Sequence, residues 1–121
     1  MKPTAAFTSL ILLAGAAHAA GDAKQGEVIF GRCAMCHTIA KGAGNGMGPN
    51  LFGVASKKAA SVQGFSYSPA LKGANITWTD DKLKAWFANP QKLVPGTRMY
   101  FSGIKKPQEA DDLIAYMKSK K

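Results

Sequence analysis

Residues 22–32 carry apolar side chains at the spacing of one helix face. Gly26, Ile29 and Phe30 of this stretch, and Cys33 just after it, lie at positions i, i+3, i+4 and i+7. A glycine inside a helix costs about 1 kcal/mol relative to alanine, so its presence needs a reason. The pattern therefore predicts a helix here, with another helix approaching closely at Gly26.

Residues 79–89 predict another helix. The apolar face of this stretch consists of Leu83, Trp86 and Phe87. Thr79 stands at the cap position, where its hydroxyl can accept a hydrogen bond from the first turn. Pro90 ends the pattern, because the residue before a proline avoids the helical conformation.

Two further helices are expected. Pro107 opens the last one, and its apolar face consists of Ala110, Leu113, Ile114 and Met117. Ser68 and Pro69 stand at the cap and at the first position of a short helix. Residues 38–54 and 91–106 lack such periodicity and predict loops, and no stretch alternates as a strand would. The sequence therefore predicts an all-α fold of three to five short helices and long loops wrapped around a cofactor.

The run Cys33-Ala34-Met35-Cys36-His37 is the main candidate for chemistry. Cys-x-x-Cys-His is the attachment signature of a c-type haem, because the thiols can form thioethers to the vinyl groups and the histidine can ligate the iron. A redox disulfide belongs near a βαβ pattern, and a structural zinc site needs four ligands; neither is found, and a simple structural disulfide is the remaining alternative. The sequence predicts one covalently bound haem c.

The second axial ligand must be a methionine, because His18 lies in a segment that we expect to be removed. The candidates are Met35, Met47, Met99 and Met117. Met35 lies between the tethering cysteines, and Met117 shares an apolar helix face. Met99 stands in an irregular loop far along the chain, from which it can reach the opposite haem face. We favour Met99 over Met47, which lies close behind the haem motif.

The run Gly48-Pro49-Asn50-Leu51 follows the haem motif in a glycine-rich loop. The Pro49 carbonyl can accept a hydrogen bond from the ring N–H of His37 and so orient the ring, as groups around metal ligands commonly do. An ordinary turn explains the composition of this run equally well.

The N-terminal residues have the pattern of a secretory signal peptide. Lys2 supplies a positive charge, an uncharged apolar run follows, and a small-x-small site ends at Ala19. The apolar run is shorter than the roughly 20 helical residues that span a bilayer. We expect residues 1–19 to be removed by cleavage after Ala19, with Ala20 as the alternative, and one domain over residues 20–121.

The chain is basic, with 16 lysines and arginines against 7 acidic residues and a net charge of +9. Such a charge favours acidic partners, but export and haem attachment argue against nucleic acid. The cations near the haem-binding runs are Arg32, Lys41, Lys92, Arg98, Lys105 and Lys106. If they surround the exposed haem edge, they would steer the protein to acidic docking surfaces.

Over residues 21–120 the chain resembles class I c-type cytochromes of the mitochondrial cytochrome c and bacterial cytochrome c2 type. The matching runs, in the family's order and spacing, are Gly26…Phe30…Cys33-Ala34-Met35-Cys36-His37-Thr38, Gly48-Pro49-Asn50-Leu51, Ile76-Thr77-Trp78, Asn89-Pro90, Pro95-Gly96-Thr97-Arg98-Met99, Gly103-Ile104-Lys105-Lys106 and Asp112-Leu113-Ile114-Ala115-Tyr116. The resemblance implies thioethers at Cys33 and Cys36. It also implies axial ligation by His37 and Met99, with the Pro49 carbonyl holding His37.

The resemblance further implies that Tyr67 and Trp78 hydrogen-bond a haem propionate and that Thr97 braces the Met99 side. The family's usual Arg, Asn and Tyr are replaced here by Lys57, Leu71 and Trp86. The usual arginine supports the propionate. We expect the three departures to tune the reduction potential of the haem and the stability of the bond between Met99 and the iron.

The implied function is that of a soluble one-electron carrier that cycles Fe(II)/Fe(III) with His/Met ligation. A peroxidase-like enzyme and a haem-based sensor are the alternatives, and each needs an open or labile sixth position. We expect a periplasmic monomer without stable membrane insertion, serving electron transport such as a respiratory chain. Its partners would present acidic docking surfaces, as on a quinol:cytochrome c oxidoreductase, a terminal oxidase or a photosynthetic reaction centre.

Overall fold

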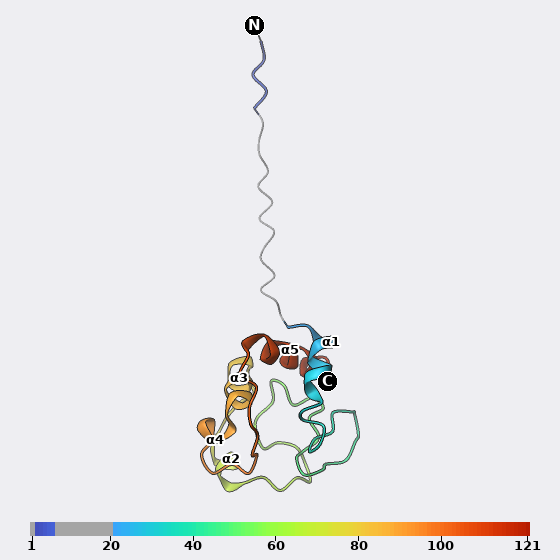
Figure 1. Ribbon diagram of the computed structural model, residues 1–121, viewed down its shortest axis with the longest axis vertical. Coiled ribbons are helices and arrows are strands. Elements are labelled where there is room, and N and C mark those ends of the chain that lie inside the picture. Colours follow the sequence, from blue (N-terminus) through green and yellow to red (C-terminus); the bar gives the residue numbers. More distant parts are fainter. Residues whose placement is uncertain (1, 7–20) are drawn as a thin grey trace.

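The computed structural model describes residues 2–6 and 21–121. Its helices are α1 (Ala23–Phe30), α2 (Pro69–Gly73), α3 (Asp80–Ala88), α4 (Pro90–Leu93) and α5 (Pro107–Lys118). Long loops join the helices, with α1 and α5 together at the end of the molecule where the described chain resumes (Figure 1). Within these residues β-structure is limited to an isolated bridge between Lys58 and Thr77. The all-α prediction is confirmed.

The predicted signal peptide falls largely outside the described residues. Residue 1 and residues 7–20 are not described, and these include the predicted cleavage site at Ala19. In the part of the chain that is described, no helix has the length and apolar character needed to cross a membrane.

Helices α1 and α5 pack against each other where Gly26 meets Asp112. A β-carbon on Gly26 would overlap the Asp112 backbone carbonyl and lie 2.7 Å from the β-carbon of Tyr116. The buried Asp112 carboxylate accepts a hydrogen bond of 2.7 Å from the Asp22 backbone N–H, and the Phe30 and Tyr116 rings lie 5.6 Å apart. The close helix approach predicted at Gly26 is confirmed.

Side chains cap three of the helices, and the predicted caps Ser68 and Thr79 are confirmed. The capping residues that accept from a backbone N–H of the first turn are Asp22, Ser68 and Thr79. One prediction was wrong, because residues 91–93, expected as loop, belong to α4. The Asn89 side chain accepts from the Lys92 N–H at 3.2 Å, and Pro90 is well suited to the first position of a helix. The residues that end α3 therefore also start α4.

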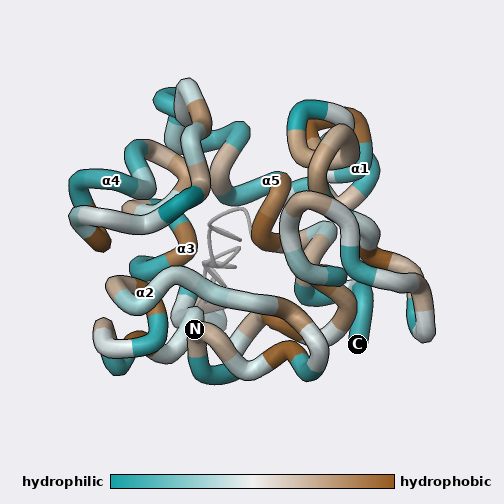
Figure 2. The backbone as a smooth tube through the Cα atoms, turned by 90° about the horizontal axis from the view of Figure 1, so that it is seen from below, coloured by the Kyte–Doolittle hydropathy of each residue, from teal (hydrophilic) through white to brown (hydrophobic). Residues whose placement is uncertain are grey.

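The core lies where α1, α3 and α5 face the loops. Its most completely buried side chains include Leu83, Ile104, Leu113 and Met117. The rings of Trp78 and Trp86 pack edge to face, 5.1 Å apart. Apolar stretches of α3 and α5 border the middle of the molecule in Figure 2. This arrangement leaves an apolar interior that the loops surround.

Candidate functional site

A cavity of about 500 Å³ lies among the loops and the inner faces of α3 and α5. This volume is in the range of pockets that hold small molecules and cofactors. Most of the lining side chains are apolar. The structure brings to this cavity every site residue predicted from the sequence: Cys33, Cys36, His37, Pro49, Tyr67, Trp78, Thr97 and Met99.

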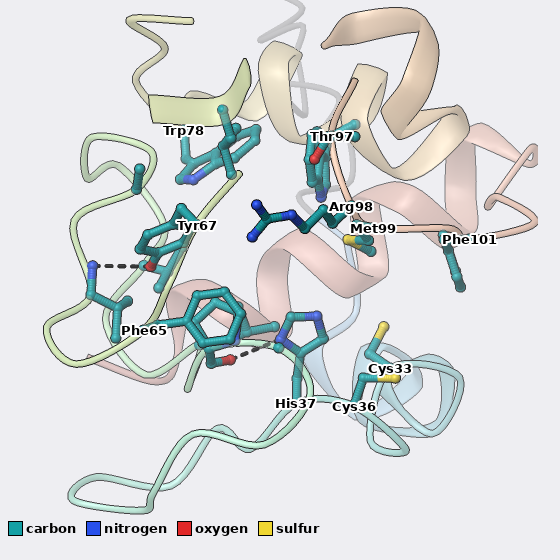
Figure 3. A pocket seen from close by; sticks show the side chains of 18 of the residues that line it. Cys33, Cys36, His37, Phe65, Tyr67, Trp78, Thr97, Arg98, Met99 and Phe101 are labelled. Carbon is teal, nitrogen blue, oxygen red and sulfur yellow. Dashed lines mark hydrogen bonds between the residues drawn. The ribbon is translucent and has the colours of Figure 1, made fainter. Parts of the chain in front are cut away.

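The two cysteines lie in a turn that continues α1. The backbone N–H groups of Cys36 and His37 both donate to the Cys33 carbonyl, at 3.1 and 3.0 Å. Both thiols are free and half-buried at one end of the cavity, beside the His37 ring (Figure 3). Burial raises the pKa of the Cys33 thiol to about 11, although the nearby Arg32 charge lowers it. One turn thus presents two thiols and an imidazole to one cavity.

The His37 ring is oriented by Pro49. Its Nδ1 lies 2.8 Å from the Pro49 carbonyl oxygen, and a carbonyl can only accept, so Nδ1 carries the proton. Burial lowers the pKa of His37, while the hydrogen bond to Pro49 opposes this shift. A neutral ring with a protonated Nδ1 keeps the lone pair on Nε2, which is the form that binds a metal.

Met99 lies across the cavity from His37, on the loop between α4 and α5 (Figure 3). The other methionines have different surroundings. Met35 is 89% exposed, Met47 is 83% exposed at the cavity rim, and Met117 is 2% exposed within the core. Met47 directly precedes the Gly48-Pro49 turn that supports His37. Met99 is therefore the partly buried methionine placed to face His37.

Three buried side chains that carry hydrogen-bonding groups also line the cavity, with exposed fractions of 8% for Tyr67, 7% for Trp78 and 3% for Thr97. The Tyr67 hydroxyl accepts a hydrogen bond of 3.1 Å from the Val62 N–H. Burial raises the pKa of Tyr67, and the Val62 hydrogen bond opposes this shift. The neutral hydroxyl keeps its own hydrogen, which can be donated to an anionic group in the cavity.

Two cations of the lining were not assigned to it from the sequence. Lys58 was not singled out, and Arg98 was placed among the surface cations. The sequence did contain one indication for Arg98, because both of its neighbours in the chain, Thr97 and Met99, were predicted site residues. The departures Leu71 and Trp86 also line the cavity.

Comparison of the sequence with known proteins identifies the family of this chain. The cytochrome c family model matches residues 23–121. The chain belongs to the cytochrome c family. It is 48% identical over 101 residues to cytochrome c of Guizotia abyssinica, covering 83% of this chain and 91% of that protein. It is also 48% identical over 101 residues to cytochrome c of Gibberella zeae, covering 83% and 95% of the two chains.

A solved structure agrees with this assignment. The chain is similar to cytochrome cH from Methylobacterium extorquens, with a TM-score of 0.78 and 48% sequence identity. The similarity covers 83% of this chain and 100% of that one. The resemblance inferred from the motifs is confirmed, and this cytochrome c is a monohaem electron carrier rather than an enzyme.

The residues of the cavity fit the covalently attached haem c of this family. Two free thiols within one turn match the thioether attachment, and the neutral His37 imidazole offers a ligand nitrogen. The apolar lining suits a large flat apolar cofactor. Haem c supplies the one-electron chemistry, and the chain's residues hold it and control access to it.

Proposed function

We propose that this cytochrome c binds its haem iron through His37 and Met99 and carries single electrons between partners in the periplasm. The observation that carries the proposal is the placement of His37 and Met99 on facing sides of one apolar cavity, beside the paired thiols of Cys33 and Cys36. Methionine ligation raises the reduction potential. With both axial positions filled, no site stays open for a substrate.

The distribution of charge supports acidic partners. Every acidic residue lies at or on α1, α3 or α5, because residues 28–79 and 82–108 contain none. Ion pairs of 2.6 to 2.9 Å further occupy some of these acids: Glu109 with Arg32, Asp111 with Lys84 and Asp80 with Lys118. The loops around the cavity are thus purely basic, which steers the protein towards negatively charged surfaces.

The proposed docking cations differ from one another in their surroundings. Arg32 pairs with Glu109 at 2.8 Å, so part of its charge is neutralised within the chain. The exposed members of the set that lie outside the cavity lining are Lys41, Lys92, Lys105 and Lys106. They suit the acidic docking surface of a quinol:cytochrome c oxidoreductase, a terminal oxidase or a photosynthetic reaction centre, with weak and fast association.

The proposed location in the periplasm rests on the N-terminal sequence. Lys2, the apolar run and the small residues up to Ala19 fit an export signal. Cleavage after Ala19, or after Ala20, would leave one cytochrome c domain over residues 20–121. N-terminal sequencing of the mature holoprotein tests this directly, and a mature chain that begins at Met1 would overturn it.

Visible spectra of the holoprotein, with carbon monoxide added to the reduced form, test the proposed ligation. His37/Met99 ligation predicts a low-spin spectrum unchanged by carbon monoxide, with the weak far-red iron–sulfur band in the oxidised form. A high-spin spectrum or ready carbon monoxide binding would mean a labile sixth position. That outcome would favour the alternative function of a haem-based sensor, in which a ligand binds the iron at this position.

A further inference from the structure

The haem cavity has permanently charged side chains of one sign only. Within the described residues, its lining contains Lys58 and Arg98 but neither aspartate nor glutamate. Both cations are exposed, and an apolar cofactor packed against them would remove part of their hydration, a loss that an anion beside them offsets. The lining is therefore suited to an anionic group that lies beside these two cations.

The position where the family's arginine usually supports a propionate does not supply that cation. Lys57 is exposed, and it is not among the described residues that line the cavity. Its backbone is engaged instead: its N–H donates to the Val54 carbonyl at 3.0 Å, and its carbonyl accepts from the Trp78 N–H at 2.8 Å. Lys57 thus holds the Trp78 backbone in place but leaves the cavity without its usual cation.

Arg98 reaches the cavity from the opposite loop. Figure 3 shows its guanidinium pointing inward, between Met99 and the side that Tyr67 and Trp78 line. The Tyr67 hydroxyl is turned the other way, towards the Val62 N–H from which it accepts a hydrogen bond. The Arg98 guanidinium is thus the group that brings a planar set of charged N–H donors into the cavity, which suits a carboxylate.

We propose that Arg98 pairs with a propionate carboxylate of the haem and replaces the arginine that this chain lacks at position 57. Arg98 is covalently next to Met99, so this ion pair also fixes the loop that carries the proposed methionine ligand. Arg98 is thus a positioning residue of the electron carrier. This inference rests on the proposed orientation of the haem between His37 and Met99.

The electrostatic consequence is a higher reduction potential. A guanidinium near the iron disfavours the extra positive charge of the oxidised state. Without Arg98 the negative charge of the propionate would be less fully neutralised, which would stabilise the oxidised state of the iron. The loop that bears Met99 would also lose an anchor at its ligand end, so the far-red iron–sulfur band would be lost more easily on heating.

The test compares the holoproteins of Arg98→Gln, Arg98→Lys, Lys58→Gln and Lys72→Gln by spectroelectrochemistry at fixed pH. Lys72→Gln removes the same charge from an exposed side chain on α2 that does not line the cavity. We expect Arg98→Gln to lower the ratio of reduced to oxidised protein at a fixed applied potential about tenfold. The control should change it less than about threefold, because solvent and salt screen an exposed charge.

Rescue and salt dependence complete the test. Arg98→Lys should recover most of the ratio and the thermal persistence of the far-red band, because it keeps the charge. The difference between Arg98→Gln and the control should persist at high salt. Equal effects of these two variants, or a larger effect of Lys58→Gln than of Arg98→Gln, would overturn the proposal. A wild-type holoprotein without the far-red band would instead refute the Met99 ligation, and the potentials would still decide the role of Arg98.

Discussion

Gly48 lies directly against the imidazole ring of His37. A β-carbon on Gly48 would lie 2.6 Å from Nδ1 and 2.7 Å from Nε2 of that ring. The ring cannot give way without weakening its 2.8 Å contact with the Pro49 carbonyl. The absence of a side chain at position 48 is therefore a steric condition for the position of the proposed ligand.

Gly48→Ala should displace the His37 ring and lower the stability of the holoprotein. Overpacking of this kind typically costs about 1–3 kcal/mol, and the displaced ring would weaken the iron bond. Denaturant unfolding and the visible spectrum check this. Gly44→Ala is the matched control, because a β-carbon there meets no atom within 4 Å. Equal behaviour of the two variants would contradict the steric role of Gly48.

Replacing Met99 and Met47 one at a time should show which of them is the axial ligand of the iron. Met99→Ala should open the sixth position, so that the reduced protein binds carbon monoxide and the far-red band disappears. Met47→Ala should leave both properties unchanged, because this side chain is 83% exposed at the cavity rim. Carbon monoxide titration of both reduced holoproteins is the measurement. The reverse pattern would assign the ligand to Met47.

Two glycines on different helices should respond differently to replacement by alanine. Gly26→Ala would gain helix propensity of about 1 kcal/mol, but its β-carbon would overlap the Asp112 carbonyl and crowd Tyr116. We expect a net loss of about 2 kcal/mol or more, because the α1–α5 packing must open. Gly73→Ala on α2 meets no atom within 4 Å and should be neutral or slightly stabilising. Guanidinium unfolding of both holoproteins decides the point.

The sequence predicted the structure best where a local pattern is compatible with only one arrangement of the chain. Apolar side chains at helical spacing located α1, α3 and α5. The cap residue Thr79 located the start of α3, and Pro107 located the start of α5. Gly26 could be interpreted because a glycine inside an apolar helix face is costly without a close neighbour. The Cys33–His37 run could be interpreted because its spacing matches the thioether attachment and iron ligation of one cofactor, haem c.

Other features depend on contacts that local sequence does not encode. The Asn89-Pro90 pair reads as a helix end, and its second role as the cap and first residue of α4 needs the backbone direction after Pro90. Gly48 looks like any other glycine in a glycine-rich loop until the His37 ring is placed. Arg98 reads as a surface cation, since nothing nearby tells which way its guanidinium points. Arg32 likewise looks free before α5 brings Glu109 to it.

Tyr67→Phe should lower stability at neutral pH and flatten its decline in alkali. The Val62 N–H loses its 3.1 Å acceptor, which costs about 1 kcal/mol. Burial raises the pKa of Tyr67 above the ordinary 10.0, so the unfolded chain loses this proton first. The contribution of the neutral hydroxyl is therefore complete below pH 10 and is lost as the pH rises through the folded value.

Unfolding free energies at pH 7, 9, 10 and 11 check this for the wild type and the variant. The advantage of the wild type should shrink above pH 10, while effects of the lysines cancel because both proteins share them. Tyr100→Phe is the control, because that ring is 84% exposed. A wild-type advantage that stays constant up to pH 11 would speak against a buried neutral Tyr67.

Electron exchange with small charged reagents should reveal the sign of the charge around the haem. The rate with an anionic oxidant such as ferricyanide should fall about tenfold from low to high ionic strength, and the rate with a cationic cobalt complex should rise. Lys41→Gln, in the loop after the haem motif, should reduce the anionic rate at low salt. Lys24→Gln removes the same charge from α1, which carries Glu27 and is capped by Asp22, and it should have less effect. Equal effects of the two variants would mean that net charge alone guides the encounter.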